Sequence, residues 1–536
     1  MISMLLILSV SFPVRIAVLG DRTGRPDDAE FEIAVSAIIE MSPDIVLSVG
    51  DFVEGNGDVE TLVEDWENML PVLQRLTNVF PFVYTPGNND IWNEETAELW
   101  RQYTGTEPSR IEDILGITFV VWNSSMESEF TAENLETIND LVDGIDTDNP
   151  WIFVTHKPFW FMAWQDSAAV SEFKGKMEET GPLAVVGGHI HLLAAQRENG
   201  ILYISAGSSG SAVPEPEPER GYFTQLGWMT VWHDSVAFAV VDARGIYSEN
   251  INTGEEMNLA YLYEEQLISA RPLEQELESA ILTLTPQENR PRRVTLDINP
   301  GTWNLRPGTL EIEIYEEPVE LVFTQSPEGS PYPSPAITVI LEYGSRDKQL
   351  QFDYSWQVLR TAEAFYSEPV LDGEGSDGEY RVPFHTNFAD LSGQPTPLPE
   401  TVFAAATDEE RLFIIMKMVD CTEETEEYGG FIFNSLDGSI LWLKVFRDGS
   451  SEALIFTSEG ELIDWEDGFD TVVNVEDGRW CLELAVDIDL LYLVDDFASV
   501  HMYRSAGEDF GTWVYPIDFD PSSMGKIWLQ CPVDPR

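Results

Sequence analysis

Five short apolar runs in the first 191 residues each end in a residue of a type that ligates metal ions. The runs have the length of buried strands, and helical spacing separates the first three, at residues 28–41 and 59–76. Alternating strands and helices predict βαβ units and a largely parallel sheet. Ligands of such sheets bind beyond the carboxyl ends of the strands. We therefore expect the polar residues at the five ends to converge on one site: Asp21, Asp51, Asn88, His156, and the pair His189 and His191.

The residue types at these five ends predict a metal centre. One polar residue after a strand is ordinary turn chemistry, but five endings of ligating type have no competing use. Six oxygen and nitrogen ligands exceed what a single tetrahedral site needs. A carboxylate at a strand tip, such as Asp51, can bridge two ions, and ions ~4 Å apart generate a hydroxide and hold the oxygens of a displacement at phosphorus. This inventory is typical of a hydrolase.

The motifs resemble those of the calcineurin-like metallophosphoesterase family over residues 14–255. That family has the order D-x-H, G-D-x-x, G-N-H-D/E, a lone H, and G-H-x-H, which stands here at residues 21–23, 50–53, 87–90, 156 and 188–191. The resemblance implies an α/β four-layer sandwich (α/β/β/α), a phosphoester substrate and two divalent metal ions, with Mn, Fe and Zn all open. It implies further that one ion takes Asp21, Asp51 and His191, and that the other takes Asp51, Asn88, His156 and His189.

Two positions depart from the family's motifs. Thr23 replaces a histidine, so the first metal loses a nitrogen ligand. Asn89 replaces the histidine that in the family lies over the metals and helps the leaving group. An amide transfers no proton, and general acid–base help is typically worth roughly 10²–10⁴-fold, so we expect slow hydrolysis or a preference for good leaving groups. The next residue, Asp90, either holds the Asn89 amide at the catalytic site or is a plain turn residue.

Basic residues are rare in this chain, and three of them lie beside the ligand positions. Arg22, Arg25 and Lys157 are candidates for phosphate binding, or they balance charge on their loops. The whole chain has 29 basic and 95 acidic side chains, which gives a net charge of −66. Such an acidic surface repels nucleic acid and anionic membranes, and this argues against both as partners.

The first twelve residues are apolar and uncharged. Residues 1–13 have the apolar character of a secretory signal, although a basic start and a clear cleavage site are missing. The run is too short to span a bilayer, and no later run is long and apolar enough to be a transmembrane segment. We therefore expect a secreted or periplasmic protein. The three cysteines, at 421, 481 and 531, fit neither a disulfide framework nor a zinc pattern.

The pattern changes to short alternating strands in the second half of the chain. Residues 256–290 predict a helical connector, and residues 291–366 a small immunoglobulin-like β-sandwich. Residues 375–536 are similar to the family 9 carbohydrate-binding, or DOMON-like, β-sandwich in the blocks 406–414, 478–486 and 501–504. That resemblance implies a glycan partner stacked on aromatic rings. The candidate rings, which are otherwise core residues, are Trp442, Trp465, Trp513 and Trp528.

Three functions compete for this sequence. The first is an exported metal-dependent phosphoesterase with an accessory C-terminal binding module. The second is a degenerate phosphoesterase that keeps its metal ligands and serves as an extracellular binding or scaffold protein. The third is a purely carbohydrate-binding protein that holds no metal.

Overall fold

The computed structural model describes most of the chain, in two compact units. It describes residues 13–55, 57–162, 167–273, 279–303, 305, 308–324, 330–344, 347–375, 379–380, 384–419, 427–457, 462–476, 478–494, 496–507, 509–517 and 524–529. One unit contains residues up to 261 with 344–348, and the other contains residues 262–343 and those from 349 onward. Except for Pro13, the predicted signal segment lies outside the described residues, as do Cys421 and Cys531.

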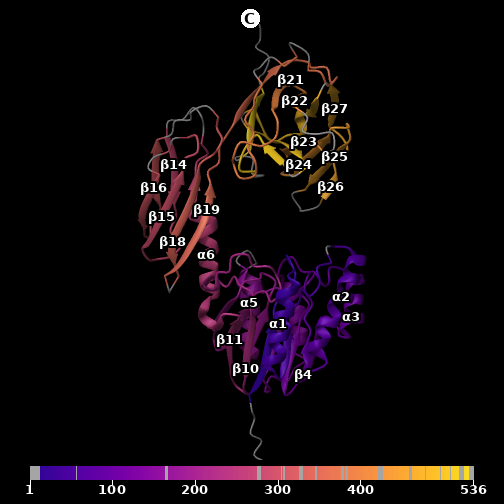
Figure 1. Ribbon diagram of the computed structural model, residues 1–536, viewed down its shortest axis with the longest axis vertical. Coiled ribbons are helices and arrows are strands. Elements are labelled where there is room, and N and C mark those ends of the chain that lie inside the picture. Colours follow the sequence, from indigo (N-terminus) through magenta and orange to yellow (C-terminus); the bar gives the residue numbers. More distant parts are fainter. Residues whose placement is uncertain are drawn as a thin grey trace, which may run out of the picture. The chain divides into compact units, whose positions relative to one another are not determined.

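Two six-stranded sheets form the centre of the N-terminal unit (Figure 1). The first has the order β12-β11-β10-β1-β2-β3, in which β1, β2 and β3 are parallel. Its strands are β1 (Val14–Leu19), β2 (Ile45–Ser48), β3 (Phe82–Val83), β10 (Leu226–Val231), β11 (Val236–Asp242) and β12 (Gly245–Ser248). The second has the order β4-β5-β6-β7-β9-β8, in which the inner four are parallel. Its strands are β4 (Arg110–Ile114), β5 (Ile117–Val121), β6 (Trp151–Val154), β7 (Ala184–Gly187), β8 (Ala194–Glu198) and β9 (Ile201–Ser205).

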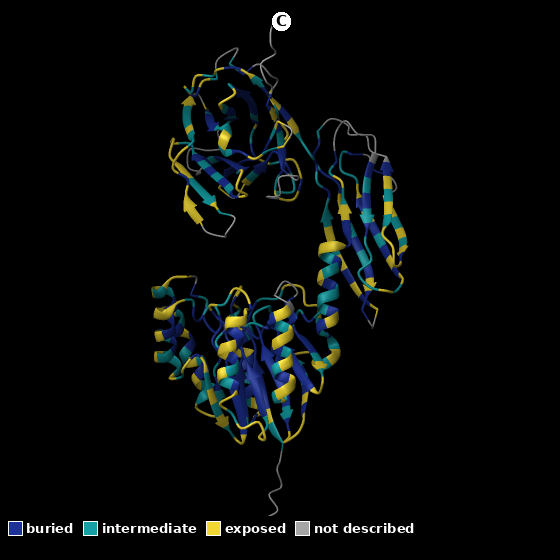
Figure 2. Cartoon of the chain, turned by 180° about the vertical axis from the view of Figure 1, so that it is seen from behind, coloured by how far each residue is buried: buried dark blue, intermediate teal, exposed yellow. Residues whose placement is uncertain are grey.

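Three separate apolar clusters show that this unit has four layers. One cluster contains residues of both sheets, such as Ile45 and Ile152. A second joins the first sheet to helices α1 (Asp28–Met41), α2 (Val59–Thr77) and α3 (Glu94–Thr104). A third joins the other sheet to α4 (Ala132–Val142) and α5 (Ser167–Thr180). The predicted α/β/β/α sandwich is therefore confirmed, and Figure 2 shows its buried strands in dark blue behind helices with exposed sides.

Capping side chains explain where the helices that pack on the first sheet begin. The Asp27 side chain accepts hydrogen bonds from the first backbone amides of α1, and Asp58 caps α2 in the same way. Asn93 and Thr96 form a reciprocal capping box at the start of α3. Such caps satisfy amides that have no partner within the helix. Each helix therefore starts shortly after a loop that leaves the carboxyl end of a strand, and these loops hold the predicted ligands.

The predicted helical connector is helical only in its first part. Helix α6 spans Gly254–Gln266, and strands β13 (Ile268–Ala270) and β14 (Ser279–Leu284) follow it. Ala280, Leu282 and Leu284 are all buried. This period of two is that of a strand with one covered face. Strand β14 pairs with β17 (Val319–Thr324), so the end of the predicted connector belongs to a three-stranded sheet of order β13-β14-β17.

The predicted small sandwich also differs at its C-terminal boundary. A four-stranded sheet has the order β16-β15-β18-β19, with β15 (Arg292–Asn299), β16 (Thr309–Ile314), β18 (Ala336–Tyr343) and β19 (Lys348–Ser355). Strand β20 (Thr361–Tyr366), which the prediction placed in this domain, pairs instead with β21 (Thr401–Thr407) and β32 (Gly525–Leu529) of the C-terminal sheet. Side-chain alternation cannot reveal the partner of a strand, because it reports only which face is buried.

The described residues from 361 onward form strands and loops, apart from one short 3-10 helix (Ile488–Leu490). A long sheet path runs β26-β25-β24-β23-β30-β32-β20-β21-β22-β28-β27 around one apolar core. Its main strands are β21 (Thr401–Thr407), β22 (Arg411–Val419), β23 (Glu427–Asn434), β24 (Ile440–Phe446), β25 (Ser451–Phe456), β26 (Leu462–Asp464), β27 (Phe469–Glu476), β28 (Arg479–Asp487), β30 (Phe497–Ala506) and β32 (Gly525–Leu529). The expectation of all-β domains after the α/β unit is confirmed.

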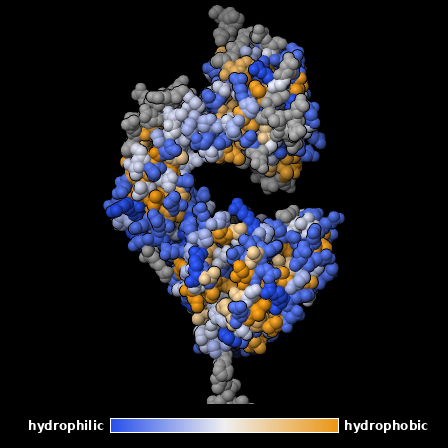
Figure 3. Space-filling model, in the orientation of Figure 1, coloured by the Kyte–Doolittle hydropathy of each residue, from blue (hydrophilic) through white to orange (hydrophobic). Residues whose placement is uncertain are grey.

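On the face drawn in Figure 3, hydrophilic residues in blue are interspersed with hydrophobic ones. Among the described residues, no helix combines the length and the apolar character needed to cross a membrane.

Candidate metal centre

Two buried aspartates follow the first two parallel strands of the first sheet. Asp21 lies two residues beyond β1 and Asp51 three residues beyond β2, and both are buried. Asp51 has a φ of 59°, a left-handed conformation that turns its carboxylate inward. Two glycines leave the necessary space, because a Cβ would lie 2.0 Å from Asp51 Oδ1 at Gly87 and 2.4 Å from Asp21 Oδ1 at Gly188.

The second sheet brings His156 against Asp51. His156 lies two residues after β6 and is fully buried. Its Nδ1 is 2.7 Å from the Val49 carbonyl oxygen, and because a carbonyl only accepts, this nitrogen carries a proton. Its Nε2 lies 3.0 Å from Asn88 Oδ1 and 3.4 Å from Asp51 Oδ2. A ring fixed through one nitrogen, with the other facing oxygen atoms, is the usual arrangement of a metal-binding histidine.

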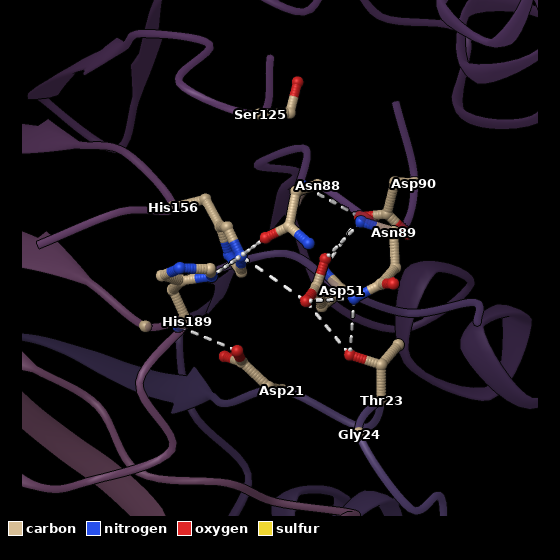
Figure 4. Close-up of polar contacts among 12 residues, drawn as sticks. Asp21, Thr23, Gly24, Asp51, Asn88, Asn89, Asp90, Ser125, His156 and His189 are labelled. Atoms are coloured by element: carbon tan, nitrogen blue, oxygen red, sulfur yellow. Dashed lines mark hydrogen bonds and ion pairs between the residues drawn. The ribbon is translucent and has the colours of Figure 1, made fainter. Parts of the chain in front are cut away.

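The two histidines after β7 reach the same place. His189 and His191 have φ values of 68° and 55°. The His189 backbone amide donates to Asp21 Oδ2 at 2.8 Å, and His189 Nδ1 lies 3.2 Å from His156 Nε2. His191 Nε2 is 3.3 Å from Asp21 Oδ2. The loop after β7 thus directs the His189 imidazole toward His156, as Figure 4 shows, and the His191 imidazole toward Asp21.

These side chains form two groups that share one residue. Asp51, His156 and His189 offer ligand atoms within 4.8 Å of one another, and so do Asp21, Asp51 and His191. Asp21 Oδ1 is buried and has no hydrogen-bond partner. A buried oxygen without a partner is costly in the absence of a cation. The mixed carboxylate and imidazole set therefore fits divalent ions such as Mn, Fe or Zn.

Buried carboxylates are concentrated at the candidate metal centre. Six are buried among the described residues, and three of them are Asp21, Asp51 and Asp90, the others being Glu256, Glu427 and Glu483. The chain has 95 acidic side chains, so a buried carboxylate is exceptional, and half of the buried ones lie at the candidate centre. Buried charges require a compensating charge or donors.

The crowding shifts the pKa values of the site residues. Burial and the charge of Asp51 raise the pKa of Asp90 to about 7. Burial opposes the charged form of His156, but Asp51 and Asp21 outweigh it and raise the pKa of His156 to about 9. Burial and the charge on His156 lower the pKa of His189 to about 3. Without a cation, one shared proton on His156 offsets part of the negative charge.

The two residues that depart from the family's motifs hydrogen-bond to Asp51 and to each other. Asn89 Nδ2 donates to Asp51 Oδ2 at 2.8 Å and to Thr23 Oγ1 at 3.1 Å. Thr23 Oγ1 donates to the same Asp51 oxygen at 3.0 Å. Figure 4 shows these contacts on one side of Asp51, with His156 on the other.

The Asp90 carboxylate makes contacts that neither expectation included. Its carboxylate accepts hydrogen bonds from the backbone amides of Asp51 and Gly87, both at 2.8 Å, and of Phe52 at 2.9 Å. The Asn89 amide is held by Asp51 and Thr23 instead. Asp90 thus fixes two strand-end loops against each other, a role that its position in the motif does not reveal.

The three predicted phosphate-binding cations have different surroundings. The Arg22 guanidinium pairs with Asp28 and donates to the Phe52 carbonyl at 3.1 Å. Lys157 Nζ donates to the backbone carbonyls of Ser125 and Glu127, and burial lowers its pKa. Arg25 is exposed and has a φ of 83°. The cations of Arg22 and Lys157 are therefore already engaged within the protein.

One supporting residue was not found from the sequence. Ser211 Oγ lies 3.3 Å from His191 Nδ1 and donates to the Thr23 carbonyl. It belongs to the loop after β9, which leaves the same edge of the second sheet. The strand-end argument applies equally to this loop, but serine is too common in turns to stand out.

A protein family model matches part of the N-terminal unit. Residues 14–193 match the family model described as calcineurin-like phosphoesterase. The comparison with curated proteins found no significant match. Solved structures similar to parts of the chain include GAP50, the anchor in the inner membrane complex of Plasmodium, with 15% identity over 44% of this chain and 86% of that chain and a TM-score of 0.33.

Two further structures are similar to different parts of the chain. The purple acid phosphatase PPD1 from yellow lupin (Lupinus luteus) seeds has 13% identity over 44% of this chain and 53% of that chain, with a TM-score of 0.36. A family 9 carbohydrate-binding module from Caldicellulosiruptor kristjanssonii, in complex with glucose, has 15% identity over 33% of this chain and 98% of that chain, with a TM-score of 0.26.

Proposed function

We propose that this protein, whose residues 14–193 match the calcineurin-like phosphoesterases, hydrolyses phosphoesters at a centre of two divalent metal ions. The observation that carries the proposal is the convergence of Asp21, Asp51 and three imidazoles, with a buried oxygen of Asp21 left without a partner. Asp21, Asp51 and His191 would hold one ion. Asp51, Asn88, His156 and His189 would hold the other. Ions in these positions would acidify water and neutralise phosphoryl oxygens.

The residues of the chain prepare the centre in three ways. The Val49 carbonyl fixes the His156 ring so that Nε2 faces the centre. Asp90 holds the backbone of Asp51 in its left-handed turn. Asn89 donates to Asp51 and fixes its carboxylate, but its amide cannot protonate a leaving group.

Hydrolysis of an aryl phosphate monoester and diester with Mn²⁺ tests the proposal. We expect metal-dependent turnover by the full chain, lost in Asp51→Asn. Asp234→Asn is a matched control, because this exposed carboxylate lies in the β10–β11 hairpin, at the opposite end of the sheet from Asp21. If the unmodified chain and Asp51→Asn both remain at background with and without Mn²⁺, the protein is a degenerate phosphoesterase, and a binding or scaffold role replaces the enzyme.

A pocket in the C-terminal domain favours a second function, the binding of a glycan. It has a volume of about 550 Å³, and its aromatic lining consists of Tyr428, Trp442, Phe456, Tyr503 and Phe510. Aromatic faces of this kind can cover the apolar face of a sugar ring. Of the four tryptophans singled out in the sequence, Trp442 is the one at this pocket. Trp465 and Trp513 are buried in the core, and Trp528 stacks on Phe497 at the surface.

Calorimetric titration with glucose and cellotriose tests this second function. We expect binding by the full chain that is lost in Trp442→Ala and kept in Trp528→Ala. Equal binding by both variants, or none by the unmodified chain, would contradict a glycan site in this pocket.

A further inference from the structure

The carboxylate of Asp51 has little capacity left for a second ion. An ionised carboxylate offers roughly four lone-pair directions. Asp51 Oδ2 already accepts from Asn89 Nδ2 at 2.8 Å and from Thr23 Oγ1 at 3.0 Å, and Oδ1 accepts from the Asn89 backbone amide at 2.9 Å. These three hydrogen bonds leave about one direction free, whereas a carboxylate that bridges two ions needs one for each ion.

Thr23 and Asn89 also hold each other in place. Asn89 Nδ2 donates to Thr23 Oγ1 at 3.1 Å, which closes a triangle with Asp51. Thr23 is fully buried, and its carbonyl accepts a hydrogen bond from Ser211. Neither donor can leave Asp51 without breaking contacts inside a packed site. We call this pair of donors the Thr23–Asn89 clamp.

The two candidate metal positions therefore differ in their affinity for an ion. The position of Asp51, His156 and His189 has two imidazoles, with Asn88 Oδ1 3.0 Å from His156 Nε2. The position of Asp21, Asp51 and His191 has one imidazole. Ser211 contacts both His191 Nδ1 and the Thr23 carbonyl, so the clamp lies beside this position and presents donors where an ion needs acceptors. Cations bind lone pairs, so a donor at that place opposes binding.

We infer that the Thr23–Asn89 clamp makes the two ions bind in sequence, the first with His156 and the second, more weakly, with Asp21 and His191. This inference rests on the proposed metal centre. The second ion enters only when Asn89 or Thr23 turns away from Asp51. Because hydrogen bonds to a charged group must break, we expect the second dissociation constant to exceed the first by about 10²-fold. The clamp is a pair of positioning residues that set how much free metal the protein needs.

Titration of the metal-free full chain with Mn²⁺ tests the inference. Equilibrium dialysis with elemental analysis gives the number of ions at each free Mn²⁺ concentration, and electron paramagnetic resonance distinguishes isolated from spin-coupled ions. We expect one tightly held, isolated ion at low Mn²⁺ and a coupled pair only at high Mn²⁺. Thr23→Val and Asn89→Ala each remove donors from Asp51, so both should tighten the second ion by about tenfold or more and leave the first unchanged.

Matched controls separate the possible failures. Thr230→Val makes the same change on β10, opposite Arg15, and should leave both dissociation constants unchanged. Two ions bound with equal affinity by the unmodified chain would overturn the clamp while leaving the phosphoesterase proposal intact. Binding no stronger than in Asp51→Asn would overturn the metal centre itself. If a clamp variant fails to fold, as judged by circular dichroism, the two dissociation constants of the unmodified chain still decide whether the ions bind in sequence.

Discussion

The carboxylate of Asp90 lies 2.8 Å from the backbone nitrogen of Asp51 and accepts its hydrogen bond. Asp51 has a φ of 59°, which a residue with a side chain adopts only when its surroundings hold it there. The same carboxylate receives the amides of Phe52 and Gly87, so one buried side chain ties the ends of β2 and β3 together. The direction in which Asp51 points depends on this contact.

We predict that Asp90→Asn disorders the Asp51 turn. One amide oxygen cannot replace two carboxylate oxygens, and the new NH₂ group would face backbone donors. The free energy of unfolding should fall by about 1–3 kcal/mol, because buried amides lose their acceptors. Urea denaturation of the metal-free protein measures this loss. Asp234→Asn should change the value little, and an equal loss in both variants would show that Asp90 has no special role.

The charge on His156 predicts how the stability of the metal-free protein depends on pH. Its pKa is raised to about 9 in the folded state, against ~6.5 for an unperturbed histidine. A raised pKa contributes stability that is fully present below pH ~6.5 and is lost as pH rises to about 9. The difference in unfolding free energy between the unmodified chain and His156→Gln should therefore shrink by about 3 kcal/mol at most over this window. A constant difference from pH 6 to 9.5 would contradict the prediction.

Asn89→His should restore a proton donor at the centre. We expect hydrolysis of alkyl phosphates, which have poor leaving groups, to rise by roughly 10²-fold or more, and hydrolysis of p-nitrophenyl phosphate to rise much less. The measurement is the ratio of the alkyl phosphate rate to the p-nitrophenyl phosphate rate, taken in the unmodified chain and in Asn89→His. If both substrates respond equally, the imidazole acts on metal binding and not on the leaving group.

A buried ion pair should be important for the C-terminal domain. Arg504 Nη2 lies 3.0 Å from Glu427 Oε2, both side chains are fully buried, and Trp480 Nε1 donates to the same oxygen. Glu427→Gln removes the charge that pairs with a buried guanidinium, and breaking a buried ion pair typically costs about 3–5 kcal/mol. Asp470→Asn, at the partly exposed Arg411–Asp470 pair, should cost less than about 1 kcal/mol. Similar losses of unfolding free energy in the two variants would refute this.

The sequence predicts the positions of the site residues better than their contacts. Apolar runs ending in Asp21, Asp51 and His156 indicate one site, because ligands bind beyond the carboxyl ends of parallel strands. The runs do not show that Asp21 and Asp51 follow strands of the first sheet and His156 a strand of the second. The hydrogen bonds of Thr23, Asn89 and Asp90 depend on side-chain directions within loops that no periodicity describes. Their predicted catalytic and metal-binding roles stay predictions, to be tested as above.

The structure differs from the predicted domain boundaries at two places. The Glu- and Leu-rich stretch 256–290 resembles a helix in composition, but β14 follows a period of two, with Ala280, Leu282 and Leu284 buried. Strand β20 has the alternation of the preceding strands but pairs with β21 and β32, a long-range choice made by packing.

The metal content of the purified full chain tests the central claim most directly. After dialysis against Mn²⁺ and removal of free metal, elemental analysis of the unmodified chain should find at least one ion per chain. The same treatment of Asp51→Asn, which alters the residue shared by both groups of ligands, should find almost none. Equal metal content in the two proteins, or no metal in either, would contradict the existence of a metal centre at the ends of these strands.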